Sequence, residues 1–208
     1  YYPGHPFLDV DYKADKDNFF LKKHSLKDDD LLLVLLPGSR QQEINNHWPI
    51  FLETIFLLKK KIPSLRFCLV KSNNVIIKNI PDFIIIESSV TNALKHGTAA
   101  ISSSGTVNLE CALAEIPTIV CYKTSYINWM IFKIFGKVNF ISIVNLISEK
   151  KIIPELVQSD MTAKKILPPL LEYLSPSSKK RKETIENYKK IRTKLGSPGV
   201  FDRAAKHI

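Results

Sequence analysis

Three short stretches of the chain carry side chains that could bind a phosphorylated ligand. The first is Pro37-Gly38-Ser39-Arg40, in which Gly38 lets the backbone approach a ligand closely and Arg40 offers forked donors suited to phosphate. An ordinary strand-to-helix turn with a surface arginine has the same composition. The chain contains no GxxxxGK(S/T) sequence, which excludes the P-loop class of nucleotide-binding proteins.

The second stretch runs from Ser102 to Thr106 and opens a predicted helix that carries Glu110. Small hydroxyl residues and a glycine at a helix start expose backbone N–H donors to a phosphate. Glu110 lies about one turn into that helix, where a carboxylate can accept hydrogen bonds from both hydroxyls of a ribose. The alternative is a capped helix with a solvated glutamate.

The third stretch lies between Asn139 and Asn145, and its main candidate is Asn145, which follows Ile143-Val144. An asparagine at a strand-to-helix junction most often caps the helix. A binding role for Asn145 therefore needs support from elsewhere in the chain.

Alternating apolar segments predict the elements that position these stretches. The unbroken apolar run 31–36 is typical of a strand buried on both faces. A helix should follow, with Asn46 as its N-cap and Pro49 in its first turn, ending near Lys61. Further segments repeat the alternation: strands at 65–70, 83–86, 98–102, 117–121 and 140–143, and helices at 89–96, at 105–114 and around Trp129, Phe132 and Phe135.

This order predicts an α/β fold, a Rossmann-like doubly wound parallel sheet, with only helices from Pro154 onward. Ligands of such sheets bind beyond the carboxyl ends of the strands, which is where all three stretches fall.

Composition narrows the class of protein. With 45% apolar and 24% charged residues, the 208-residue chain is globular rather than disordered. Its net charge of +10 is concentrated at 179–194, which favours nucleic acid, anionic lipid or phosphorylated small molecules as partners. The three cysteines form no CxxC pair, so neither a zinc site nor a disulfide framework is indicated, and His47 and His96 have no metal-ligand spacing. No apolar run reaches the roughly 18 residues of a membrane span.

Taken together, the motifs resemble those of the lipid-A-disaccharide synthases along essentially the whole chain. The matching residues are Gly4-His5-Pro6 with Leu8-Asp9, Leu35 to Arg40 with Glu43-Ile44 and Pro49, Ser104-Gly105-Thr106 with Leu109-Glu110, Pro117 to Val120 with Tyr122-Lys123, and Asn145-Leu146-Ile147. Asn108 departs from the pattern, because the family more often has a small residue there.

The resemblance implies the C-terminal, donor-binding half of a GT-B glycosyltransferase, in which two Rossmann-like domains face each other across a cleft. It implies an interdomain linker at 1–29, a donor-binding domain at 30–175, and basic C-terminal helices at 176–208 that pack back on the fold or on a partner. The implied reaction transfers 2,3-diacylglucosamine from UDP to 2,3-diacylglucosamine 1-phosphate (lipid X). No cofactor and no metal are expected.

Roles follow from matching position. Arg40 and Asn145 are the expected catalytic residues of this half, and His5 belongs to the hinge motif. The family's general base lies in the N-terminal acceptor domain, so this half alone is expected to bind donor weakly and to transfer nothing. The implied donor contacts are Gly38, Ser39, Arg40, Ser104, Gly105, Thr106, Glu110 and Asn145.

The implied location is the bacterial cytoplasm, peripheral on the inner face of the inner membrane, because the substrates are acylated. Aromatic residues between Tyr126 and Phe135, beside Lys123, Lys133 and Lys137, are typical of an interfacial amphipathic segment or of a core helix. The basic helix 179–194 could contact anionic lipid or form a solvated face. A homodimer is implied by resemblance only.

Other functions remain open at this point. Another GT-B enzyme that uses UDP-N-acetylglucosamine, such as a peptidoglycan glycosyltransferase or an epimerase, would share the fold and the ribose-binding acid. A basic nucleic-acid-binding module would explain the charge, although no motif that reads RNA or DNA is present. An inactive gene remnant is a third alternative.

Overall fold

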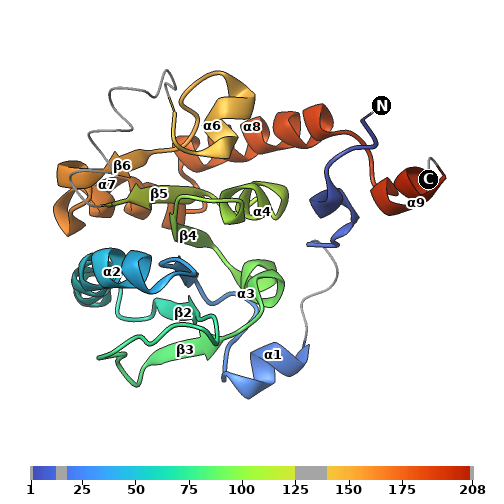
Figure 1. Ribbon diagram of the computed structural model, residues 1–208. Coiled ribbons are helices and arrows are strands. Elements are labelled where there is room, and N and C mark those ends of the chain that lie inside the picture. The colour runs from blue at the N-terminus through green and yellow to red at the C-terminus, as the bar shows by residue number, and fades with distance from the viewer. Residues whose placement is uncertain (1, 13–17, 125–139, 207–208) are drawn as a thin grey trace.

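Six parallel strands form the centre of the molecule, in the order β3-β2-β1-β4-β5-β6. The computed structural model describes residues 2–12, 18–124 and 140–206 (Figure 1). The strands are β1 (Leu32–Leu36), β2 (Arg66–Val70), β3 (Ile84–Glu87), β4 (Ala99–Ser103), β5 (Thr118–Tyr122) and β6 (Glu155–Val157). The first strand, β1, lies at the centre of the sheet. The next two strands extend the sheet to one edge at β3, and β4, β5 and β6 then extend it to the other edge. The predicted doubly wound α/β fold is confirmed.

Helices cover both faces of the sheet (Figure 1). One face packs on α2 (Gln41–Lys61) and α7 (Ala163–Leu174), and the other packs on α3 (Val90–His96), α4 (Val107–Leu113), α6 (Ile143–Ser148) and α8 (Lys179–Leu195). The remaining elements are η1 (Pro6–Asp9), α1 (Asn18–Lys23), η2 (Gln158–Asp160) and α9 (Val200–Ala205). Because both faces are covered, every residue of β1 is buried, which explains its unbroken apolar sequence.

The long helix α2 begins at Gln41, so the predicted N-cap at Asn46 is wrong. The carboxylate of Glu43 accepts hydrogen bonds from the backbone N–H groups of Ser39 and Arg40, which ends the preceding loop and lets the helix start earlier. Pro49 consequently lies inside the helix rather than in its first turn. The buried apolar side chains of α2 offset the cost of that proline, which is about 3 kcal/mol.

The predicted strand at 140–143 is also wrong. Ser142 instead caps α6, because its hydroxyl accepts hydrogen bonds from the N–H groups of Val144 and Asn145. The sixth strand is β6, at Glu155–Val157, where only helices were expected. It is three residues long and none of them is fully buried, so it has no apolar pattern by which to recognise it. The helix expected around Trp129, Phe132 and Phe135 lies outside the described residues.

The two ends of the chain meet beside α4 and α8 (Figure 1). Leu8 and Tyr12 are buried in the same cluster as residues of α8 and α9, and Asp9 accepts hydrogen bonds from backbone N–H groups at the start of α9. Residues 2–12, predicted to belong to a linker, are therefore folded onto the C-terminal helices. The division at 29 and 175 stays a prediction.

Candidate functional site

A hollow of about 770 Å³ opens at the carboxyl ends of the first four strands. Its volume is in the range of small-molecule sites. Four strand-end loops line it: Gly38, Ser39 and Arg40 after β1, residues 71–74 after β2, Ser88 after β3, and residues 103–107 with Glu110 after β4. The structure therefore brings together seven of the eight sequence-predicted contact residues, and only Asn145 is missing from the lining.

Glu43 holds the loop that carries Arg40. Its carboxylate accepts hydrogen bonds from the N–H of Ser39 (2.9 Å) and of Arg40 (3.3 Å), and lies 3.4 Å from Nη1 of Arg40. Gly38 permits this turn, because its φ is +128° and a Cβ there would overlap the Glu43 side chain. These two backbone donors are thus already used, and what the loop offers a ligand is the Arg40 side chain, which is 82% exposed.

The space beside the backbone differs between the two loops: beside Gly38 it is occupied by the Glu43 side chain, and beside Gly105, in the loop after β4, it is empty. Gly105 has a φ of +153°, and no atom lies within 4 Å of the position of a Cβ there, so a ligand can approach the backbone closely. Ser104 is half-buried, while Gly105 and Thr106 are exposed. Behind the loop the hydroxyl of Ser102 donates to the side-chain oxygen of Asn108. Asn108, the departure from the family pattern, is buried and joins α4 to β4.

Glu110 is half-buried, which differs from the solvated carboxylate of the alternative interpretation. The hydroxyl of Tyr12 donates a hydrogen bond of 3.1 Å to its Oε2. Burial raises the pKa of Glu110 above its ordinary value, and the hydrogen bond from Tyr12 opposes that rise. Burial and the neighbouring Glu110 together raise the pKa of Tyr12. Tyr12 therefore stays protonated as the donor of this pair.

His47 joins two of the strand-end loops behind the hollow. It is fully buried on α2, its Nδ1–H donates to the carbonyl oxygen of Pro37 (2.7 Å), and its Nε2 accepts from the N–H of Lys123 (3.1 Å). The side chain of Asn46 donates to the carbonyl oxygen of Lys123 (3.1 Å). Burial lowers the pKa of His47, so the ring is neutral and both bonds form. His47 fixes the Pro37 loop relative to the end of β5.

Asn145 lies apart from the hollow, in a fully buried position on α6. Its amide group donates to the carbonyl oxygen of Ile153 (3.0 Å) and to Oε1 of Glu155 (2.8 Å). Its side-chain oxygen accepts from the N–H groups of Ile152 (2.9 Å) and Ile153 (3.1 Å). Both ends of the amide are thus used within the protein, where they tie α6 to the start of β6.

Sequence reasoning missed the part of the lining that follows β2 and β3. Directly after the predicted strand at 65–70 come Lys71, Ser72, Asn73 and Asn74. Ser88 is separated from the predicted strand at 83–86 by a single residue. The rule that ligands bind beyond strand carboxyl ends applies to them equally. Applied to every predicted strand, that rule predicts these lining residues as well.

The remaining candidate groups are part of the core. The three cysteines are free and buried, and burial raises the pKa of Cys68 and of Cys111 to about 12. Within the described ranges, no three or more His, Cys, Asp or Glu side chains gather as metal ligands would. None of the helices in the described part of the chain combines the length and apolar character needed to cross a bilayer. The aromatic segment between Tyr126 and Phe135 lies outside the described residues.

Comparison with known proteins agrees with the motifs. A family model described as lipid-A-disaccharide synthetase matches residues 1–201. A lipid-A-disaccharide synthase of Syntrophus aciditrophicus is 32% identical over 97% of this chain and 55% of its own length. The same enzyme of a Sulfurihydrogenibium species is 30% identical over 100% of this chain and 58% of its own. The chain thus spans little more than half the length of these relatives.

Solved structures with the same fold include MurG of Acinetobacter baumannii, with a TM-score of 0.54 and 13% identity over 99% of this chain and 55% of that one. A UDP-GlcNAc 2-epimerase of Neisseria meningitidis, solved with UDP-GlcNAc bound, has a TM-score of 0.54 and 12% identity over 93% of this chain and 54% of that one. At such identities the structures establish the fold, and the sequence matches decide the family. The sequence matches favour neither a nucleic-acid-binding module nor another UDP-N-acetylglucosamine enzyme. The chain belongs to the lipid-A-disaccharide synthase family of GT-B glycosyltransferases.

Proposed function

We propose that the hollow holds the nucleoside diphosphate of a UDP-sugar and that this chain supplies the donor side of a lipid-A-disaccharide synthase. The observation that carries the proposal is that Arg40 and Glu110, which come from loops after different strands, line one hollow. In this arrangement Glu110 accepts hydrogen bonds from the ribose hydroxyls, as acidic residues of Rossmann-like folds do. The open backbone at Gly105 and the Arg40 guanidinium then contact the diphosphate.

The charge around the hollow suits a leaving diphosphate. Arg40 is strongly exposed, and its pairing with Glu43 at 3.4 Å is a surface pair of little strength, so the guanidinium can turn toward a ligand. Lys71 adds a second positive charge to the lining. When the acceptor hydroxyl oxygen bonds to C1 of the donor sugar, its proton passes to the general base, and the bond from C1 to the β-phosphate oxygen breaks with its electron pair going to that oxygen. Positive groups at that point stabilise the departing diphosphate.

The proposed donor is UDP-2,3-diacylglucosamine and the proposed acceptor is lipid X. We assign the acceptor site and the general base to an N-terminal acceptor domain, as the family resemblance implies. Asn145 receives no donor contact in this proposal, because its amide is used by Ile152, Ile153 and Glu155. Its part is to support α6 and β6.

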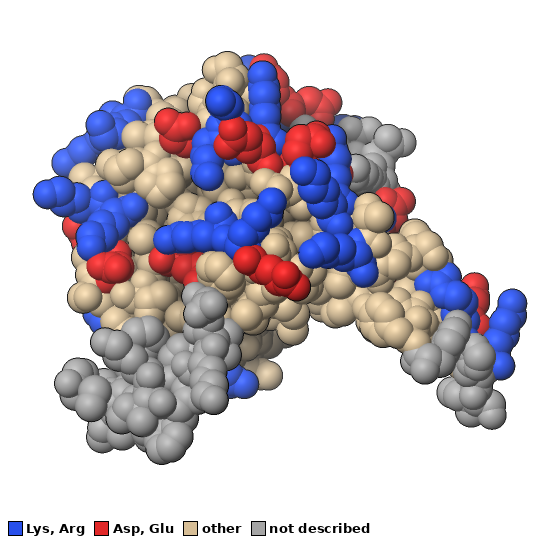
Figure 2. Space-filling view, turned by 90° about the horizontal axis from the view of Figure 1, so that it is seen from above, with Lys and Arg blue, Asp and Glu red and all other residues tan. Residues whose placement is uncertain are grey.

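We also propose that the chain works at the inner face of the bacterial inner membrane and contacts anionic lipid through α8. That helix buries Thr184, Tyr188, Ile191 and Leu195 and keeps its exposed lysines on the other side. Basic and acidic side chains alternate on the face seen from above (Figure 2), so the attraction should be modest and sensitive to salt. Flotation with anionic vesicles tests it, and binding that is absent at low salt contradicts it. A homodimer stays a prediction.

Calorimetry with UDP tests the nucleotide site. Glu110→Ala should weaken UDP binding by about 1.5–3 kcal/mol, the range for hydrogen bonds to a charged group. Glu172→Ala is the matched control, because Glu172 is an exposed glutamate on α7 and accepts a hydrogen bond from Ser178. Unchanged affinity in Glu110→Ala would remove the ribose role from Glu110.

A further inference from the structure

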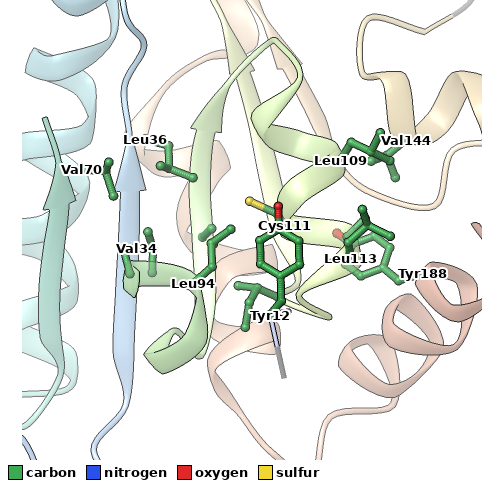
Figure 3. Close-up of a cluster of buried hydrophobic side chains, with 14 of the residues drawn as sticks. Tyr12, Val34, Leu36, Val70, Leu94, Leu109, Cys111, Leu113, Val144 and Tyr188 are labelled. Atoms are coloured by element: carbon green, nitrogen blue, oxygen red, sulfur yellow. The ribbon is translucent and has the colours of Figure 1, made fainter. Parts of the chain in front are cut away.

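Tyr12 reaches the candidate site from a distant part of the sequence. It lies 98 residues before Glu110, and its hydroxyl donates to Oε2 of that residue at 3.1 Å. The ring is only 5% exposed and lies among buried side chains that include Leu94, Cys111 and Leu113 (Figure 3). Because the Tyr12 ring is buried in the core, its contact with Glu110 is formed behind the hollow's lining rather than on the surface.

The segment that carries Tyr12 is held by the other end of the chain. The carboxylate of Asp9 accepts from the backbone N–H groups of Gly199 (2.5 Å), Val200 (3.1 Å) and Phe201 (3.0 Å) at the start of α9. Arg203 of that helix donates through Nε and Nη2 to the carbonyl oxygen of Pro3, at 3.0 and 2.8 Å. The position of the Tyr12 hydroxyl is thus set by α9 on one side and by the core on the other.

We propose that Tyr12 is a positioning residue for Glu110, one that keeps the carboxylate aimed at the ribose. This inference rests on the proposed function and adds to it a residue outside the hollow's lining. A carboxylate has two oxygens with about four acceptor positions in all. The hydrogen bond from Tyr12 occupies one position on Oε2, which leaves Oε1 and the rest of Oε2 for two ribose hydroxyls.

Burial works against the role assigned to Glu110, and Tyr12 counters it. A half-buried carboxyl is shifted toward its neutral form, and a protonated carboxyl accepts from two hydroxyls less well. A hydrogen bond to the charged form restores that form. Among the described residues, Cys111 lies beside Glu110 on α4, and the titratable side chains of Arg40, Glu43 and Lys71 line the same hollow.

The test is the affinity of the full chain for UDP between pH 4.5 and 8, with Tyr12→Phe compared to the wild type. Removing the hydroxyl should weaken UDP binding by about three- to tenfold at neutral pH, the span of an ordinary hydrogen bond. Because the pKa of Glu110 then rises further, the loss of affinity on acidification should begin at a higher pH. Tyr173→Phe is the control, since Tyr173 is fully buried and its hydroxyl accepts from Thr184 instead.

A shift of the acid limb in Tyr12→Phe but not in Tyr173→Phe supports the proposal. Affinity curves of the wild type and Tyr12→Phe that coincide would overturn it while leaving the UDP site intact. If the wild type binds no UDP, the proposed function fails, and the titration of the Glu110 carboxyl carbon by NMR then decides about Tyr12. An equal midpoint in both chains overturns the proposal, and a higher one in Tyr12→Phe supports it.

If Tyr12→Phe does not fold, the wild-type chain still provides a measurement. The proposal expects the chemical shift of the Tyr12 hydroxyl proton or ring to follow the titration of Glu110. A Tyr12 signal that stays constant while the Glu110 carboxyl titrates would contradict it.

Discussion

Two polar junctions lie at strand ends of the same sheet, one at the start of β6 and the other beyond the carboxyl ends of β1 to β4, and they use their polar groups in opposite ways. Around Asn145, both the donor and the acceptor atoms of the amide are bonded to Ile152, Ile153 and Glu155. Around the hollow, Gly105 and Thr106 are exposed, and the Arg40 side chain is 82% exposed. The first junction stabilises the fold and the second has groups left for a ligand. Residue type alone does not separate these roles, whereas the bonding partners do.

The largest effect should come from breaking the saturated junction. Asn145→Ala leaves the N–H groups of Ile152 and Ile153 buried without their partner, so the free energy of unfolding should fall by about 3 kcal/mol. Denaturant unfolding measures it. Asn73→Ala is the matched control, an exposed asparagine of the hollow, whose change should stay within about 0.5 kcal/mol. A stable Asn145→Ala chain that no longer binds UDP would reverse the comparison.

The two glycines of the hollow should differ in the same way, with Gly38 needed mainly for stability and Gly105 mainly for ligand binding. Gly38→Ala should cost about 2–3 kcal/mol of stability, because the backbone is strained and the new methyl overlaps Glu43. Gly105→Ala should cost about 1 kcal/mol, since only the backbone is strained there and the space beside it is open. UDP affinity should nevertheless fall in Gly105→Ala, because the methyl enters the ligand's space. Thermal unfolding with calorimetry separates the two, and equal stability losses would contradict the account.

The smallest effect is expected from His47, and only at acid pH. Since burial lowers its folded-state pKa below the ordinary 6.5, the unfolded chain takes up the proton first. The stability that His47 contributes is complete above pH 6.5 and is lost as the pH falls below it. His47→Gln should remove that part of the pH dependence in denaturant unfolding. A pH profile identical to that of the wild type would show that His47 takes up its proton equally readily in the folded and unfolded chains, which contradicts a lowered folded-state pKa.

The features that local sequence could predict are those that depend on neighbours in sequence. The unbroken run in β1 and the turn at Gly38 both point to their structures, and together they led to the rim of the hollow. The roles of Tyr12 and Asp9 could not be predicted, because their partners lie 98 and 190 residues away. β6 was missed because three half-exposed residues show no periodic pattern of apolar side chains. Asn145 was expected at the donor site by resemblance to the family, and nothing in the local sequence reveals that Glu155 accepts a hydrogen bond from its amide.

The central claim is that Arg40 and Glu110 hold different parts of one nucleotide, and comparing UDP with uridine tests it most directly. Calorimetry should show that Arg40→Ala weakens UDP binding by about tenfold or more and leaves uridine binding unchanged, because uridine has no phosphate. Glu110→Ala should weaken the binding of both ligands, because both have the ribose hydroxyls. If Arg40→Ala weakens uridine as much as UDP, or if neither substitution affects UDP, the two residues do not share a ligand in this way.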